Sequence, residues 1–380
     1  MDERKFDVKS IIGFALIFVL LMWFMNNNKP SQEELAKHKA QQEQQANKTA
    51  ANTQNNTSTV QPTDLGNFAY STTLPSAKNE VTVLENKDLK LTISNRGGQP
   101  KEVLLKEFKT YDALPVYLVK DWNATFSLNF TTAQDKKLNT KDLYFEPTLS
   151  ENNGSQVLSM KLKTSENTYL EYVYTLPKEG YMLDLVVRSQ GLAGAVNTSK
   201  PMNIDWKLQA RRMEKSVTYE NRYTQVAIQY EGDRINRMSQ ASNDEQKEEK
   251  VSWVAYKQHL FTSVLISDNP FEKGDFVSHN IAMNEGKEVK YTKNFLTFLP
   301  IKAKSGELSE SLHFYFGPSD YNVLKQYNDK YELTELIPLG WGIFGWLNKW
   351  LFIPLYNFLA DYFSVGLVII LMTFIVRILL

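Results

Sequence analysis

The sequence contains no cysteine, only four histidines, and no excess of charge of either sign. The absence of cysteine excludes disulfides, thiol catalysis and thiolate metal sites. The histidines, His38, His259, His279 and His313, do not lie at metal-ligand spacing from one another, so no metal site is predicted. The 43 basic and 43 acidic residues balance, which argues against nucleic-acid binding by bulk attraction.

Catalytic motifs are also missing. The chain has no G-x-S-x-G, phosphate-loop or H-E-x-x-H pattern. A sugar epimerase would need a histidine acid and a glutamate base that face each other in a cleft. His259 or His313 with an acidic partner leaves that alternative open, although isolated histidines on strands are more often structural. We therefore expect no catalytic residues, no enzymatic activity and no cofactor.

The most apolar stretch is residues 339–380, in which only Lys349, Asp361 and Arg377 are charged. From Ser364 onward the residues are almost all Val, Ile, Leu, Met and Phe, hydrophobic on every side as a spanning helix must be. A spanning helix needs about 20 such residues. We assign residues 362–380 to a transmembrane helix.

Residues 339–361 have a different pattern, in which apolar residues recur at helical spacing on one face and polar ones on the other. The apolar positions are Ile343, Leu347, Trp350, Leu351, Pro354 and Phe358, and the opposite face holds Asn348, Lys349 and Tyr356. Indole rings favour the headgroup layer of a bilayer. The pattern predicts an amphipathic interfacial helix that is anchored by Trp341, Trp346, Lys349 and Trp350.

Arg377 permits two interpretations. A charge well inside a membrane helix costs roughly 2.5 to 3.5 kcal/mol, so it normally faces protein or water and has a function. Alternatively, Arg377 snorkels to the cytoplasmic headgroups as an ordinary anchor. Ile378, Leu379 and Leu380 continue the apolar run beyond the charge and favour the first interpretation. Thr373, one helical turn earlier, lies on the same face.

The N-terminal end predicts a second membrane segment. Residues 1–10 hold Arg4, Lys5 and Lys9, and we expect them to be cytoplasmic. An uncharged apolar run follows, and residues 11–28 are assigned to an uncleaved signal anchor, transmembrane helix 1. The alternative is a removed export signal, but no small-residue cleavage pattern follows the run. Residues 29–75 are Gln-, Asn- and Thr-rich, which predicts a disordered polar linker.

Residues 76–320 show short alternating runs separated by turns, which predicts a large all-β domain of two packed sheets. Examples are the runs 169–176 and 182–189, and the turns at 85–88 and 95–98. Between Arg211 and Lys250 the sequence is charged and irregular, and we interpret it as a solvated insertion, with a partner-docking loop as the alternative. A connecting helix is expected within residues 321–338, with its cap at Asp320.

The segment GWLNKWLFIPLYNFLADYFSVGLVIILMTFIVRILL resembles the interfacial helix and second membrane span of the bacterial YidC-type membrane protein insertases (YidC/Oxa/Alb family). SNRGGQPKEVLLKEF resembles the early strands of their periplasmic domain. The resemblance implies a mostly β chain: a periplasmic β-super-sandwich, similar to galactose mutarotases, flanked by a transmembrane helix on one side and an interfacial plus a transmembrane helix on the other. Family members continue into further spans, so we expect this chain to be a fragment of a longer protein.

The resemblance also implies a function. Arg377 and Thr373 would line a hydrophilic groove in the bacterial inner membrane, through which nascent membrane proteins insert with or without the Sec translocon. The ribosome would bind parts outside this chain. A membrane-tethered carbohydrate-binding or mutarotase-like domain is the alternative, and a scaffold that recruits the Sec translocon could coexist with insertion.

Overall fold

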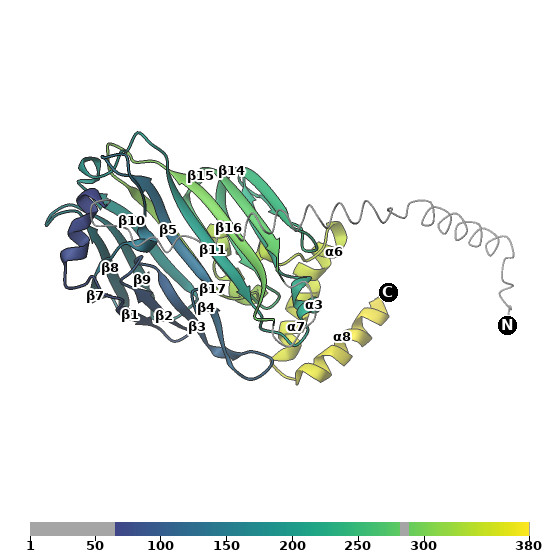
Figure 1. Cartoon of the computed structure of the whole chain (residues 1–380). Helices are drawn as coiled ribbons and strands as arrows, with labels where there is room; N and C mark the ends of the chain where they lie inside the picture. Colours follow the sequence, from purple (N-terminus) through teal and green to yellow (C-terminus); the bar gives the residue numbers. More distant parts are fainter. Residues whose placement is uncertain (1–64, 282–288, 380) are drawn as a thin grey trace, which may run out of the picture. The chain divides into compact units, whose positions relative to one another are not determined.

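The computed structural model describes residues 65–281 and 289–379, and transmembrane helix 1 as assigned above lies outside them. All of the described residues belong to one compact unit, residues 61–380. Its strands form two antiparallel sheets, and Figure 1 labels most of them. The smaller sheet has the order β1-β2-β3-β4, with β1 Val81–Glu85, β2 Leu89–Ser94, β3 Pro100–Lys109 and β4 Pro115–Val119.

The larger sheet has 13 strands, in the order β6-β5-β11-β16-β15-β17-β10-β9-β8-β7 with β12, β13 and β14 attached beside β15. The strands are β5 Ala124–Thr131, β6 Lys137–Asn139, β7 Glu146–Asn152, β8 Ser155–Lys163, β9 Tyr169–Leu176, β10 Met182–Gln190, β11 Met202–Arg211, β12 Gln225–Tyr230, β13 Arg234–Arg237, β14 Asp244–Lys257, β15 Phe261–Asn280, β16 Tyr291–Ile301 and β17 Ser309–Pro318.

Strand β15 joins two layers of the larger sheet. Its first part, residues 261–267, pairs with β17, whereas residues 275–280 pair with β16. The layer that contains β16 and the layer that contains β17 face each other. The Phe126 ring on β5 lies 5.3 Å from the Phe314 ring on β17, and the Trp206 ring on β11 lies 5.7 Å from the Phe314 ring. The sheet therefore folds over at β15 and encloses an aromatic core, as alternating apolar residues on paired strands require.

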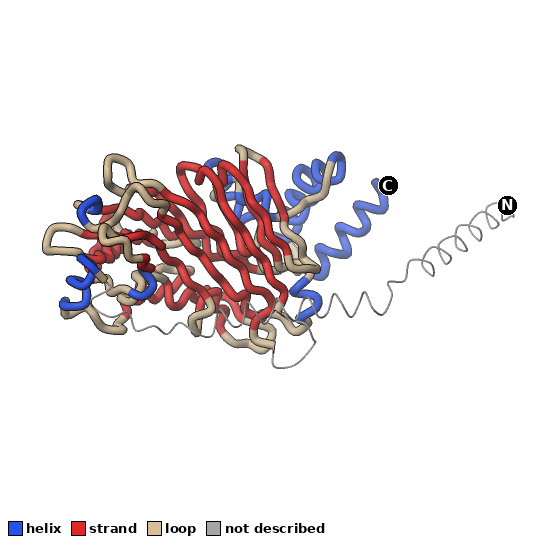
Figure 2. Tube along the Cα trace, turned by 45° about the horizontal axis from the view of Figure 1, so that its top comes forward, coloured by secondary structure: helices blue, strands red, loops and turns tan. Residues whose placement is uncertain are grey.

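The helices are drawn in blue in Figure 2. They are η2 Gly66–Thr73, η3 Thr140–Asp142, η4 Leu192–Gly194, α3 Val217–Asn221, α4 Tyr321–Lys325, α5 Asn328–Tyr331, η5 Leu333–Leu336, α6 Gly342–Leu347, the π-helical turn η6 Asn348–Phe352, α7 Ile353–Ala360 and α8 Val365–Leu379.

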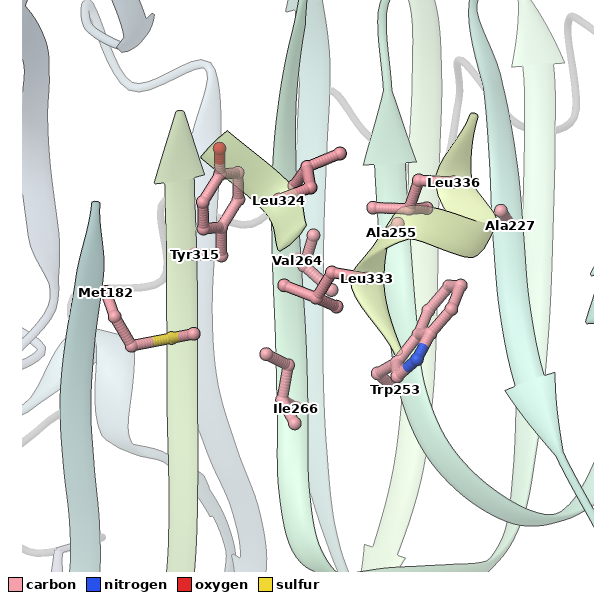
Figure 3. Packing of buried hydrophobic residues seen from close by; sticks show 10 residues of the cluster. All are labelled: Met182, Ala227, Trp253, Ala255, Val264, Ile266, Tyr315, Leu324, Leu333 and Leu336. Carbon is pink, nitrogen blue, oxygen red and sulfur yellow. The ribbon is translucent and has the colours of Figure 1, made fainter. Parts of the chain in front are cut away.

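The segment 321–338 packs on the outer face of the large sheet. Leu324 from α4 and Leu333 and Leu336 from η5 are fully buried there, against Trp253, Tyr315 and other core residues (Figure 3). The indole Nε1 of Trp253 donates to the Tyr331 carbonyl at 3.0 Å. The chain that leaves the sandwich is therefore held against it before the C-terminal helices begin.

The structure confirms the mostly β fold class and many of the predicted boundaries. The turn at 85–88 joins β1 to β2, and the turn at 95–98 places Gly97 and Gly98 at positive φ, where glycine is favoured. Strand β9 has the predicted bounds. Asp320 caps α4, since its carboxylate accepts from the amides of Asn322 and Val323.

Three expectations were wrong in detail. Residues 211–250 are not an irregular insertion: they hold α3, β12, β13 and half of β14, whose charged first part pairs with β15 and exposes alternate side chains. The polar linker does not extend to residue 75, because Phe68 in η2 is fully buried against the Phe130 ring. Segment 321–338 forms three short helical turns rather than one helix, since α4, α5 and η5 each end within five residues.

Candidate functional site

Residues 342–360 form a continuous run of helix, α6, η6 and α7, at the position predicted for the interfacial helix. The π turn of η6 widens the helix by one residue per turn, and such turns often mark functional segments. The Asn348 amide Nδ2 donates to the Leu339 carbonyl at 2.6 Å and so fixes the chain that enters the helix.

The four predicted anchors are all exposed. Trp341, Trp346 and Trp350 expose between 60% and 84% of their surface, and Lys349 is exposed beside them. Trp346 and Trp350 lie one turn apart on either side of Lys349, and Trp341 immediately precedes the first residue of α6. A helix that exposes so much aromatic surface has an apolar face without a protein partner among residues 65–281 and 289–379.

Not all residues of the predicted apolar stripe are equally exposed around the π turn. Trp350, Pro354 and Phe358 are exposed together, but Leu347 and Leu351 are half-buried. Leu359 is buried, and α7 contacts α8. The extra residue of the π turn rotates the helix faces, which an ideal 3.6-residue period could not predict.

Helix α8 carries the two predicted groove residues. Thr373 and Arg377 lie four residues apart on the exposed face of α8, and the Thr373 hydroxyl donates to the Ile369 carbonyl at 2.7 Å. The same exposed surface includes Phe374 and Ile378. Over the part of the chain that the structure describes, no helix has both the length and the hydropathy needed to cross a bilayer.

The C-terminal helices are tied to the sandwich. Asn322 on α4 and Asn357 on α7 donate to each other through their side-chain amides, at 3.2 Å and 3.0 Å. On the sandwich side of this link, Lys330 forms an ion pair with Asp268 at 2.9 Å, and Gln229 donates to Glu332 at 2.7 Å. These contacts run through the segment 321–338 described above.

Each histidine that the sequence left open as an acid–base candidate has an acidic partner within the fold. His313 lies 2.7 Å from Asp184 and 3.1 Å from Asp268, and His259 lies 2.5 Å from Glu214. In both cases histidine and carboxylate are already hydrogen-bonded to each other rather than separated by a cleft.

A cavity of about 330 Å³ lies between the sheet and α5, near one of these pairs. Its walls include Gln229, Trp253, Asp268, Lys330 and Glu332, but not His313. The indole N–H of Trp253 is already used within the fold. Within the described residues, no group of histidine and acidic side chains has the arrangement of a metal site.

Sequence reasoning missed a cluster at the end of the sandwich. Glu220 on α3 is 1% exposed and accepts from the backbone amides of Met213 and Glu214. Burial raises the pKa of the Glu220 carboxyl to about 7, although these amides oppose the shift. Tyr223 stacks on the His259 ring at 4.5 Å. The only sequence signal for this cluster is the charged stretch after Arg211, from which a solvated insertion is expected.

Comparison with known proteins adds to this geometry. The family model of the YidC periplasmic domain matches residues 81–354, from β1 into α7. The chain belongs to the YidC periplasmic domain family. The match includes the sandwich, the connecting segment and most of the interfacial helix, and it confirms the resemblance stated from the sequence.

Curated relatives extend the similarity to both ends. Over 98% of its length the chain is 31% identical to a membrane protein insertase YidC of Bacteroides fragilis, and 32% identical to one of Porphyromonas gingivalis. A more distant YidC of Amoebophilus asiaticus is 29% identical over the same share. The chain spans 61%, 62% and 63% of these relatives, respectively.

Two solved structures are among those that match this chain. A YidC insertase crystal structure with its first transmembrane domain resolved is 13% identical, with a TM-score of 0.37 over 80% of this chain and 55% of that one. A putative aldose 1-epimerase of Escherichia coli is 10% identical, with a TM-score of 0.39 over 62% of this chain and 98% of that one.

Proposed function

We propose that this chain is the N-terminal part of a membrane protein insertase, which assists nascent inner-membrane proteins into the bilayer without covalent chemistry. The observation that supports this most is the exposed face of α8, where Thr373 and Arg377 stand one turn apart among apolar side chains. The insertase name of the relatives, over 98% of this chain, favours this function over a tethered carbohydrate-binding domain.

The arginine has a physical task in such a protein. Transfer of unpaired polar groups into hydrocarbon costs several kcal/mol each. A water-filled groove that bears the Arg377 guanidinium reduces this cost for polar or acidic flanks of a nascent segment. The Thr373 hydroxyl already donates to Ile369 of its own helix, but its oxygen can accept a further hydrogen bond and extend the polar stripe.

The helices α6 to α7 would lie in the headgroup layer of the bacterial inner membrane. Exposed Trp341, Trp346 and Trp350 suit that layer, and Lys349 can reach the lipid phosphates. Residues 11–28 and 362–380 would be the two membrane spans of this part, with the N-terminus cytoplasmic and the sandwich periplasmic. The relatives are longer than this chain, and further spans in the rest of the protein would complete the groove.

The partners follow from this assignment. Nascent membrane proteins are the substrates, the Sec translocon is a cooperating partner, and the ribosome binds segments beyond this chain. Neither a cofactor nor a metal is required, because the groove lowers an electrostatic barrier and breaks no bond.

The experiment is complementation in cells depleted of the insertase, with the full-length protein. Arg377→Ala should lose most of its insertion activity, whereas Arg377→Lys, which keeps the positive charge, should retain much of it. Membrane levels of each variant serve as the control for folding. Equal activity of both variants and the parent would refute the role assigned to this charge.

A further inference from the structure

Three segments that are far apart in the sequence meet at one end of the sandwich. They are the β3–β4 turn, residues 110–114, the α3 segment, residues 212–223, and the β14–β15 turn, residues 258–260. The Tyr111 amide donates to the Met213 carbonyl at 3.1 Å, which joins the first two. The side-chain amide of Gln258 donates to the Glu220 carboxylate at 3.3 Å, which joins the third, and to the carbonyl of the adjacent Arg211 at 2.6 Å. We call this surface the turn platform.

The turn platform is internally fixed. The Glu220 carboxylate binds the amides of Met213 and Glu214 and receives a hydrogen bond from Gln258 at 3.3 Å. The Glu214 carboxylate is hydrogen-bonded to Nδ1 of His259 at 2.5 Å. Tyr219 meets the His259 ring edge-on at 5.2 Å. The three segments therefore form one rigid surface rather than independent loops.

The outer side of the turn platform is apolar and aromatic. A well-packed soluble domain rarely gathers several large exposed apolar residues in one place without a partner for them. Here five such residues expose between 38% and 59% of their surface: Tyr111, Leu114, Tyr219, Tyr223 and Leu260. The exposed basic residues on or beside the platform are Lys109, Lys215 and Arg222, and the exposed acidic ones are Asp112 and, at its edges, Glu107 and Asp320.

The turn platform also adjoins the point where the chain leaves the sandwich. The Ser319 amide donates to the Leu260 carbonyl at 2.7 Å, and Asp320, the next residue, caps α4. Helix α4 is the element whose Asn322 pairs with Asn357 of the aromatic helix α7. In Figure 1, α3 and α7 appear at this same end. Two exposed aromatic surfaces thus share one end of the unit.

We propose that the turn platform is a second membrane-contact surface, which rests on the anionic headgroup layer beside the interfacial helix. Tyrosine suits this layer because its ring is apolar and its hydroxyl stays hydrated. Lys109, Lys215 and Arg222 are positioned to pair with lipid phosphates. The inference rests on the proposed function, since it requires α6 and α7 to lie at a bilayer. It adds that the sandwich itself contacts the membrane surface through the turn platform.

The test uses spin labels on the full chain, which has no cysteine of its own. Single labels at Leu114→Cys, Leu260→Cys, Phe358→Cys on α7 and Leu149→Cys on β7 are placed in nanodiscs of phosphatidylethanolamine and phosphatidylglycerol. All four positions are exposed, so each label leaves the core intact. Collision rates with oxygen, which concentrates in lipid, are compared with those of a water-soluble nickel chelate.

Labels at Leu114, Leu260 and Phe358 should favour oxygen by several-fold relative to Leu149, and the preference at Leu114 and Leu260 should fall when phosphatidylcholine replaces phosphatidylglycerol. If Phe358 favours oxygen while Leu114 and Leu260 match Leu149, the turn platform does not contact lipid and the proposed function stands. If Phe358 also matches Leu149, the interfacial helix and this inference are both wrong. Protection of Leu114 and Leu260 only after addition of purified Sec translocon would make the platform a protein-docking surface and overturn the lipid assignment.

Discussion

Asn322 and Asn357 form a reciprocal pair of amide hydrogen bonds, at 3.2 Å and 3.0 Å, between α4 on the sandwich and α7 of the interfacial helix. Both belong to residues 321–360, through which the β domain is joined to the C-terminal helices. The fixed position of segment 321–338 on the sheet means that this pair transmits the orientation of the sandwich to α7.

Removal of this pair should loosen α7 without unfolding the sandwich. Asn357→Ala eliminates both hydrogen bonds, which contribute about 1 kcal/mol each. Distance distributions between spin labels on the sheet and on α7 should broaden in this variant. Tyr356→Ala, which alters the neighbouring exposed residue, is the matched control and should leave the distribution narrow. A narrow distribution in both variants would mean that the amide pair does not hold α7.

Leu333 should be one of the residues on which stability depends most. Its side chain is fully buried under η5, so Leu333→Ala should lower the free energy of unfolding by about 2–5 kcal/mol. Glu335→Ala, an exposed change in the same turn, should shift it by less than about 0.5 kcal/mol. Chemical denaturation followed by circular dichroism measures both. Similar values for the two variants would show that segment 321–338 does not pack as described.

Glu220 predicts a pH dependence of stability. Because its pKa is raised from 4.5 to about 7 in the folded chain, the folded state holds a proton between these values that the unfolded state has released. The contribution of Glu220 to stability is therefore complete below pH 4.5 and falls as the pH rises to about 7, by about 3 kcal/mol at most.

The Glu220→Gln variant provides the comparison, since its amide stays neutral at every pH. Unfolding of the parent and of the variant at pH 5 and pH 8 should show that the parent loses more stability than the variant over this interval. Equal losses would mean that Glu220 is ionised in the folded chain at pH 5 and that burial does not control its pKa.

The sequence predicted the parts in which local pattern and tertiary environment agree. Strand β9, with alternating residues, and the turn before β2, where the Asn86 side chain accepts from Asp88 and Leu89, were both identified. The charged run 244–250 was missed, because its strand is exposed and is held by backbone pairing with β15 rather than by an apolar face. Phe68 was missed because one buried ring fixes an otherwise polar segment.

In the candidate site, too, local features could be predicted from the sequence, whereas contacts between distant residues could not. The helical spacing of apolar and aromatic residues predicted the aromatic helix, and the four-residue separation of Thr373 and Arg377 predicted that they share one helical face. The Asn322–Asn357 pair and the turn platform join residues that are remote in sequence, so no local pattern indicates them. The π turn at residues 348–352 rotates the helix faces and follows from no periodicity in the residues.

The central claim is that the Thr373–Arg377 face of α8 contacts the nascent chain. The most direct measurement is photo-crosslinking in the full-length protein, with a probe at Thr373 and a control probe at Leu371, which lies on the opposite, half-buried side of α8. Ribosome-bound membrane proteins stalled during insertion serve as substrate. We expect crosslinks to the nascent segment from Thr373 and few from Leu371. Labelling of lipid alone from both positions would contradict the account and leave Arg377 as a membrane anchor.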